Sequence, residues 1–202
     1  MIHLKDYKKV LLWGLILAPY IIFPILIFMY FGNQPTKPPT SFIVIDKSAM
    51  ILKAYDKNGQ VILKSQVATG KGIGNKKKVG DLKTPEGVFS ISDIEDASTW
   101  KHDFKDDTLG LIDGAYGPLF IRLSVPGHKG IGIHGTHDPS SIGKRVTEGC
   151  IRLRNYELQL LAKIIEPGIP VMILPAKEDL VIHSGNKATH KNMKIPPRPS
   201  GI

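Results

Sequence analysis

The chain has 202 residues, of which 42% are hydrophobic, 22% are charged and one is a cysteine. This length allows one compact domain with a membrane segment and short tails, and it excludes two sizeable hydrophobic cores. The formal net charge of +9 fits an anionic membrane or polymer. No zinc-finger spacing, aromatic ribonucleoprotein motif or basic helix with heptads accompanies the charge, so we expect no nucleic-acid partner.

An almost continuously apolar run from Val10 to Phe31 follows the first nine residues. About twenty such residues span the core of a bilayer, and Pro19 and Pro24 are tolerated in a membrane helix although they favour a kink. Lys5, Lys8 and Lys9 precede the run, which by the positive-inside rule keeps residues 1–9 in the cytoplasm. We therefore expect residues 10–31 to be a single-pass transmembrane signal anchor of the cytoplasmic (inner) membrane. The rest of the chain would then lie in the periplasm or the cell-wall space.

A cleaved signal peptide is the alternative for this segment. The apolar run is longer than the hydrophobic region of a usual signal peptide, and no small-x-small cleavage site follows it. The sequence favours an anchor that stays attached.

Three further segments follow the apolar run. Residues 32–40 contain several prolines and predict a stiff extended linker. Residues 41–177 alternate apolar runs with turn residues and predict the folded domain. Residues 178–202 are rich in Lys, His, Asn and Pro and have too few apolar residues to pack, so we expect a disordered tail.

Within the domain, short β-branched runs separated by turns predict a mainly β fold. An Asn-Gly pair within residues 56–59 predicts a hairpin turn. One segment, Asn155–Ile165, has helical spacing and a possible Asn cap, and it stops before a Glu-Pro-Gly sequence. The expected architecture is a β-sandwich or open barrel with one or a few short helices. The strand candidates are residues 41–46, 50–55, 61–68, 88–92, 119–124, 131–134, 151–153 and 171–174.

The single cysteine, Cys150, excludes an intramolecular disulfide, and a free thiol outside the cytoplasm needs a reason. A lone cysteine is usually a small buried apolar residue. Here Gly149 precedes it in a turn entering a strand, while His134 ends another strand and is followed by Gly135. A cysteine that acts as a nucleophile needs a base within hydrogen-bond reach. It also needs N–H donors at the position where the oxyanion of the reaction forms. No Asp or Asn is obviously placed to orient the imidazole, so we expect a backbone carbonyl near Gly135 to hold Nδ1.

The two segments resemble the L,D-transpeptidase family, whose catalytic unit is often called the YkuD domain. His134-Gly135-Thr136 is followed, after a gap, by residues 147–153, which read Thr-Glu-Gly-Cys-Ile-Arg-Leu. Residues 83–89 (KTPEGVF) are similar to the turn that precedes a strand in this family. The resemblance covers about residues 41 to 175, and it implies an L,D-transpeptidase-like β fold.

The resemblance also implies roles for individual residues. Cys150 would be the acylated nucleophile and His134 the proton acceptor, then donor, while the backbone N–H groups of Glu148, Gly149 and Cys150 would form the oxyanion hole. Many members carry a histidine where this chain has Glu148, and we expect no catalytic role for the Glu148 side chain. The expected substrate-binding residues are Arg152, Gly135, Thr136, Thr147 and, at the cleft wall, Tyr116.

Other polar groups have simpler interpretations. His134 could be a satisfied core histidine, and Arg152 could be purely structural. His134, His137 and Asp138 lack the further ligands that a zinc site needs, so we expect no metal and no cofactor. The remaining histidines, among them His102 and His128, and the run Lys76–Lys78 are expected to be solvated.

The residues alone predict an extracytoplasmic cysteine acyltransferase or hydrolase, and the resemblance implies a membrane-anchored L,D-transpeptidase that acts on peptidoglycan stem peptides. The acyl-enzyme at Cys150 would release D-Ala and then be cleaved by an acceptor amine. Two alternatives remain. Water could resolve the same acyl-enzyme, which describes an L,D-carboxypeptidase or amidase, or the chain could be a non-catalytic peptidoglycan-binding module.

Overall fold

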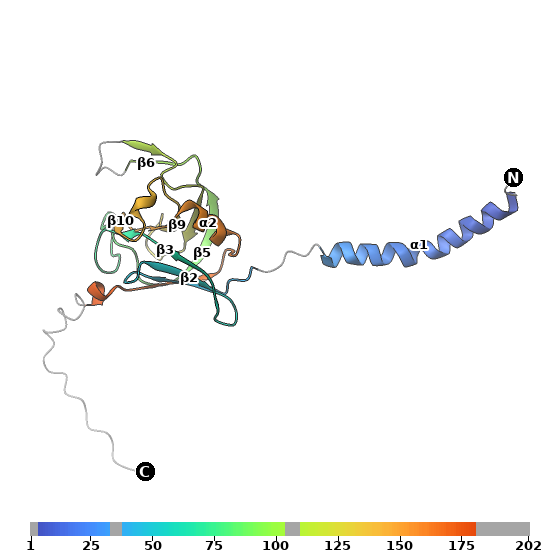
Figure 1. The fold of residues 1–202 in the computed structure, drawn as a ribbon, viewed down its shortest axis with the longest axis horizontal. Helices are drawn as coiled ribbons and strands as arrows, with labels where there is room; N and C mark the ends of the chain where they lie inside the picture. Colours follow the sequence, from blue (N-terminus) through green and yellow to red (C-terminus); the bar gives the residue numbers. More distant parts are fainter. Residues whose placement is uncertain (1–3, 33–37, 104–109, 181–202) are drawn as a thin grey trace, which may run out of the picture. The chain divides into compact units, whose positions relative to one another are not determined.

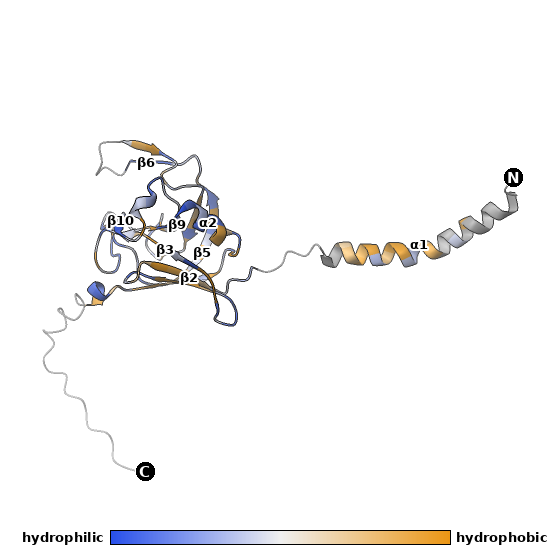
Figure 2. Ribbon diagram, viewed as in Figure 1, coloured by the Kyte–Doolittle hydropathy of each residue, from blue (hydrophilic) through white to orange (hydrophobic). Residues whose placement is uncertain are grey.

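The computed structural model describes residues 4–32, 38–103 and 110–180, which form two compact units that divide after Lys37. The first unit contains one helix, α1 (Leu4–Gly32), with Pro19 and Pro24 inside it. Apolar residues cover much of its described surface, and Tyr20, Phe23 and Phe28 are each more than 60% exposed (Figure 2). No helix among the described residues is long and apolar enough to cross a membrane. The predicted transmembrane segment at residues 10–31 is helical, and its membrane crossing stays a prediction.

The second unit is mainly β and is built on one eight-stranded sheet in the order β11-β9-β8-β5-β12-β1-β2-β3 (Figure 1). Its strands run antiparallel except for the β1–β12 and β9–β11 pairs. Two small two-stranded sheets, β4 with β10 and β6 with β7, complete the unit. The strands are β1 (Phe42–Asp46), β2 (Ile51–Tyr55), β3 (Val61–Gln66), β4 (Thr69–Gly70), β5 (Gly87–Asp96), β6 (Lys101–Asp103), β7 (Leu111–Asp113), β8 (Leu119–Leu123), β9 (Gly132–His134), β10 (Arg145–Thr147), β11 (Ile151–Arg152) and β12 (Pro170–Leu174).

Strand β5 joins the two halves of the sheet. Its first residues, Gly87–Ser90, pair with β12, and its later residues, Ile91–Asp96, pair with β8 through a register shift after Ile91. Such an irregularity bends the strand and increases its twist. The sheet therefore curves into a half-barrel, in agreement with the predicted open barrel.

Alternation along the strands places the core on the inner face of this curved sheet. Ile43 and Ile45 of β1 are fully buried, as are Leu52 and Ala54 of β2. Helix α2 (Asn155–Ala162) adds Leu158 and Leu161 to the same core. The helix ends three residues before the predicted Ile165.

The residue before α2, Arg154, is the N-cap and makes no side-chain capping bond, so the predicted Asn155 cap is wrong. The Asn155 side chain instead accepts a hydrogen bond from the Thr136 N–H at 2.7 Å. This bond ties the first residue of α2 to the chain that leaves β9.

The folded unit extends past the predicted boundary at residue 177. Asp179 is completely buried and forms an ion pair with Lys47 at 2.8 Å, while Lys47 also contacts Glu86 at 2.7 Å. Burial alone raises the pKa of Asp179, but hydrogen bonds from Lys47 and from the Ala176 and Gly74 N–H groups outweigh it and lower the pKa to about 2. Residues 178–180 therefore belong to the domain, and the rest of the predicted tail, residues 181–202, lies outside the described residues.

We predict that Asp179→Asn lowers the free energy of unfolding by about 3 kcal/mol, because breaking a buried ion pair leaves Lys47 with one carboxylate partner instead of two. Urea unfolding followed by circular dichroism measures the change. Glu178→Gln is the control, since this side chain is 63% exposed and its one ion pair, to Arg145, is 3.9 Å long. A chain ended after residue 177 should be less stable than one ended after residue 180. Equal stabilities would show that Asp179 does not stabilise the domain.

Candidate active site

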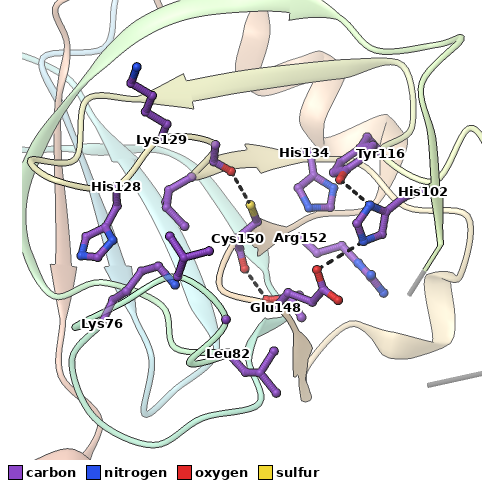
Figure 3. Close-up of a pocket in the computed structure, with 15 residues that line it drawn as sticks. Lys76, Leu82, His102, Tyr116, His128, Lys129, His134, Glu148, Cys150 and Arg152 are labelled. Carbon is purple, nitrogen blue, oxygen red and sulfur yellow. Dashed lines mark hydrogen bonds and ion pairs between the residues drawn. The ribbon is translucent and has the colours of Figure 1, made fainter. Parts of the chain in front are cut away.

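The parallel pairing of β9 with β11 brings the two predicted catalytic residues together. The register sets Ile133 opposite Ile151 and His134 opposite Arg152. Both isoleucines are fully buried in the core. Because neighbouring residues of a strand face opposite sides, His134 and Arg152 face away from that core, and so does Cys150, two residues before Arg152. All three line one pocket of about 300 Å³ (Figure 3).

Aromatic rings pack against the imidazole of His134 and hold it in place. Phe120 of β8 stacks on it, with ring centroids 5.8 Å apart and planes 6° apart, and Tyr116 meets it edge-on at 4.9 Å. A Cβ at Gly132 would lie 2.3 Å from the Phe120 ring. Glycine at 132 is therefore required for Phe120 to reach His134.

A backbone carbonyl orients His134, as the sequence predicted. Nδ1 of His134 lies 2.7 Å from the carbonyl oxygen of Gly135. A carbonyl can only accept, so Nδ1 carries the proton and Nε2 is left as the basic nitrogen. This is the tautomer that a general base requires.

The thiol and the imidazole are both neutral near pH 7. Burial, followed by the nearby charge of Arg152, lowers the pKa of His134 to about 3, although its bond to Gly135 opposes the shift. Burial also raises the pKa of the Cys150 thiol, to about 11. Cys150 is itself partly exposed to the pocket, and water there moderates this desolvation. A neutral thiol must lose its proton as it attacks, and the role of His134 as the base that accepts this proton stays a prediction.

The turn before Cys150 is held by hydrogen bonds within the motif. The Thr147 hydroxyl donates to the Cys150 carbonyl at 2.6 Å and accepts from the Gly149 N–H at 3.2 Å. Gly149 has a φ of 136°, and a Cβ there would lie 2.7 Å from the Lys83 carbonyl oxygen, so glycine is needed. The thiol itself donates to the Gly130 carbonyl at 3.3 Å (Figure 3).

These bonds bear on the predicted oxyanion hole. The Gly149 N–H is engaged by Thr147, and the roles of the N–H groups of Glu148, Gly149 and Cys150 stay predictions. Thr147 lines the pocket but also shapes the turn that carries Cys150.

The other predicted substrate-binding residues divide into two groups. Arg152 and Tyr116 line the pocket, and Arg152, 4% exposed, also donates to the Ser141 hydroxyl at 3.0 Å. Gly135 and Thr136 are not among the pocket-lining residues. A Cβ at Gly135 would lie 2.2 Å from Oδ1 of Asn155, so these two residues join the end of β9 to α2 rather than face the pocket.

The sequence analysis missed much of the pocket wall. His102 and His128, predicted to be solvated, both line the pocket, and so does Lys76, whose side chain is 5% exposed and contacts Asp81 at 2.9 Å. These residues come from loops and from the β6–β7 hairpin, and no local pattern marks them. The further residues of the wall are Val79, Gly80, Leu82, Lys129, Gly130, Ile131 and Glu148. Within the described residues, no group of three or more His, Cys, Asp or Glu side chains is arranged to hold a metal ion.

Comparison with known proteins identifies the family. Residues 40–173 match the L,D-transpeptidase catalytic domain, YkuD. The chain is 35% identical over 170 residues to the "Putative L,D-transpeptidase YqjB" of Bacillus subtilis, covering 82% of this chain and 89% of that protein. It is 45% identical over 62 residues to the "Putative L,D-transpeptidase YkuD" of Bacillus licheniformis, covering 31% of this chain but only 36% of that protein.

A solved structure agrees in fold. The NMR structure of the catalytic domain from the E. faecium L,D-transpeptidase superposes with a TM-score of 0.50 at 24% identity, covering 67% of this chain and 98% of that one. At this identity the likeness shows the shared fold.

The pKa shifts at the site predict how stability depends on pH. Since the folded protein holds the Cys150 proton up to a higher pH than the unfolded chain, folding stability should fall as pH rises above about 9. The slope is at most about 1.4 kcal/mol per pH unit, reduced by water in the pocket. His134 acts in the opposite direction. The unfolded chain binds its proton below about pH 6.5, so stability falls as pH decreases from there toward 3.

Unfolding of wild type and Cys150→Ala, compared from pH 8 to 11, isolates the thiol contribution. The alkaline loss should be smaller in Cys150→Ala. Parallel curves over this range would contradict the raised pKa of Cys150.

Proposed function

Because this chain belongs to the family of L,D-transpeptidase catalytic domains, we propose that it cross-links peptidoglycan stem peptides through an acyl-enzyme at Cys150. The observation that carries the proposal is the β9–β11 pairing, which sets Cys150 and an Nε2-basic His134 on one face and in one pocket. A purely peptidoglycan-binding module would not need a thiol and a base so arranged.

In the acylation step, Nε2 of His134 removes the thiol proton as the sulfur attacks the carbonyl carbon of the third stem-peptide residue. The C–N bond to the terminal D-Ala breaks, and the protonated His134 returns the proton to the leaving amine. A thioester at Cys150 remains. The neutral thiol and imidazole of the resting site suit this concerted transfer, because each begins in the protonation state that the step requires.

In the second step, an acceptor amine attacks the thioester carbonyl. The new C–N bond forms, the C–S bond breaks, and His134 passes a proton from the amine to the sulfur. If water attacks instead, the product is a free carboxylate, which describes an L,D-carboxypeptidase. The nature of the nucleophile is decided by what binds beside Cys150.

We further propose that residues 10–31 hold the domain at the outer face of the cytoplasmic membrane. The support is the length of the apolar run and the three lysines before it. The polymer that the proposed reaction needs lies on that side.

Cys150→Ala is expected to abolish acylation by a tetrapeptide stem, and His134→Ala to slow it by about 100-fold or more, because each removes a member of a nucleophile–base pair. Mass spectrometry of the intact protein detects the acyl group on Cys150. Circular dichroism of both variants checks the fold. Acylation of well-folded Cys150→Ala, or an unchanged rate in His134→Ala, would contradict these roles.

The same measurement with and without an acceptor amine assigns the second step. A cross-linked product that appears with the amine supports transpeptidation, whereas release of a free acid at the same rate in both cases supports the carboxypeptidase.

The membrane proposal predicts the outcome of a protease-accessibility experiment. In cells whose outer surface is permeabilised, added protease should digest the domain from about Ser41 and leave a small membrane-bound N-terminal fragment. Digestion that requires rupture of the cytoplasmic membrane would place Cys150 on the inner side and remove peptidoglycan as its substrate.

A further inference from the structure

Glu148 belongs to a chain of hydrogen bonds that spans one side of the pocket. Oε2 of Glu148 lies 3.3 Å from Nε2 of His102, and Nδ1 of His102 lies 3.0 Å from the hydroxyl of Tyr116 (Figure 3). His102 comes from β6, Tyr116 from the segment before β8, and Glu148 from the turn before β11. All three line the pocket that holds Cys150 and His134.

The chemistry of the three groups fixes the direction of these bonds. An ionised carboxylate can only accept, so in the neutral imidazole Nε2 of His102 donates to Glu148 and Nδ1 accepts from the Tyr116 hydroxyl. Burial, and then the neighbouring charges of Cys150 and Glu148, raise the pKa of Tyr116 to about 12, which keeps its hydroxyl protonated. Tyr116 thus holds His102, and His102 holds one oxygen of Glu148.

The second carboxylate oxygen, Oε1, has no hydrogen-bond or ion-pair partner among the described residues, and the Glu148 side chain is 45% exposed. Glu148 is separated from the nucleophile by Gly149 alone. An oriented, solvent-accessible carboxylate beside a reactive sulfur would attract a cation. The hydrogen bond from His102 settles which oxygen is presented to the pocket.

We propose that Glu148 is the binding site and first base for the acceptor of the second step, a primary ammonium group. This inference rests on the proposed function and adds a division of labour to it. His134 passes a proton to the sulfur of Cys150, and Glu148 accepts a proton from the incoming nitrogen. His102 and Tyr116 are positioning residues that act through Glu148.

The proposal divides the two protons of an incoming ammonium group between two bases. An ammonium R–NH₃⁺ loses two protons when it becomes the nitrogen of an amide. The first goes to Glu148, which frees the nitrogen lone pair for attack on the thioester carbonyl. The second goes through His134 to the Cys150 sulfur as the C–S bond breaks. Glu148 then releases its proton to water.

The opposite side of the pocket carries the other sign of charge. Lys129 lines it with His128 and with Lys76, whose charge is paired with Asp81 at 2.9 Å (Figure 3). An ammonium is repelled there and attracted by Glu148, so the charges in the pocket direct an amine to the side of the chain formed by Glu148, His102 and Tyr116. Arg152 also lines the pocket on this side, and its guanidinium donates to the Ser141 hydroxyl at 3.0 Å (Figure 3).

Two amines of different charge test the proposal on the full-length protein. After acylation by a tetrapeptide stem, the acyl-enzyme is mixed at pH 7 with glycinamide, which is mostly protonated, or with hydroxylamine, which is uncharged. Glu148→Gln should slow thioester aminolysis by glycinamide about 100-fold relative to acylation, and aminolysis by hydroxylamine much less. Glu148→Asp should restore part of the glycinamide rate, because it keeps the charge.

Two further variants separate positioning from general disturbance. His102→Ala should raise the glycinamide concentration needed for half-maximal rate more than it lowers the maximal rate, since it loosens Glu148 without removing the carboxylate. Asp113→Asn is the matched control, because this β7 carboxylate pairs with the exposed Lys101 and does not line the pocket. It should leave both amine rates unchanged.

Equal losses with glycinamide and hydroxylamine, or no loss, in Glu148→Gln would overturn the proposal. A wild-type protein that the tetrapeptide does not acylate would overturn the proposed function instead. NMR of the His102 ring then tests the binding of the ammonium group directly. Glycinamide should shift the His102 ring resonances of wild type and not those of Glu148→Gln, and an absence of shift in wild type would overturn the site on its own.

Discussion

The parallel pairing of β9 and β11 is the constraint on which the active site depends. Sixteen residues lie between His134 and Ile151, and parallel neighbours cannot be joined by a tight turn. The connection instead contains a 3₁₀ turn at Pro139–Ser141 and strand β10, which pairs with β4. A slip of one residue in the β9–β11 register would turn His134 into the core and Ile133 into the pocket. Since Ile133 and Ile151 are both fully buried, packing of the core enforces the register that the chemistry needs.

That same packing sets the protonation states of the nucleophile and base. His134 is 3% exposed between Phe120 and Tyr116, so its charged form is disfavoured, and the walls around Cys150 disfavour the thiolate. A site of this kind holds no preformed thiolate–imidazolium pair. In the proposed mechanism, charge appears at the sulfur and the imidazole only when a carbonyl carbon is present to accept the electron pair. In an oxidising compartment a neutral thiol is also less reactive toward oxidants than a thiolate.

The sequence contained the local part of this information. The Asn-Gly turn correctly predicted the β2–β3 hairpin, and the glycine-flanked His134 and Cys150 pointed to the site before any geometry was known. Tyr116, expected at the cleft wall, lines the pocket. Lys76, His102 and His128 were read as solvated because their neighbours in sequence are polar. The pocket arises where segments far apart in the chain meet, such as Glu148 beside His102, and no periodicity of the sequence records such contacts. The predicted capping role of Asn155 is wrong for the same reason. Its hydrogen-bond partner, Thr136, follows β9 and lies 19 positions earlier in the chain.

Part of the pocket wall that the sequence did not predict is held in place by charged residues that have no role in the proposed mechanism. The loop from Lys71 to Glu86 supplies Lys76, Val79 and Leu82 to the pocket. The carboxylate of Asp81 holds the turn of this loop together, because it accepts hydrogen bonds from Lys76 and from the N–H groups of residues 77, 78 and 83. Lys47 and Asp179 hold the ends of this loop, through Glu86 and the Gly74 N–H. Lys47 is fully buried, and its ammonium group contacts the carboxylates of both Glu86 and Asp179. The shape of the pocket therefore depends on Asp179, a residue near the end of the domain that lies 105 positions from Gly74 in the loop it supports.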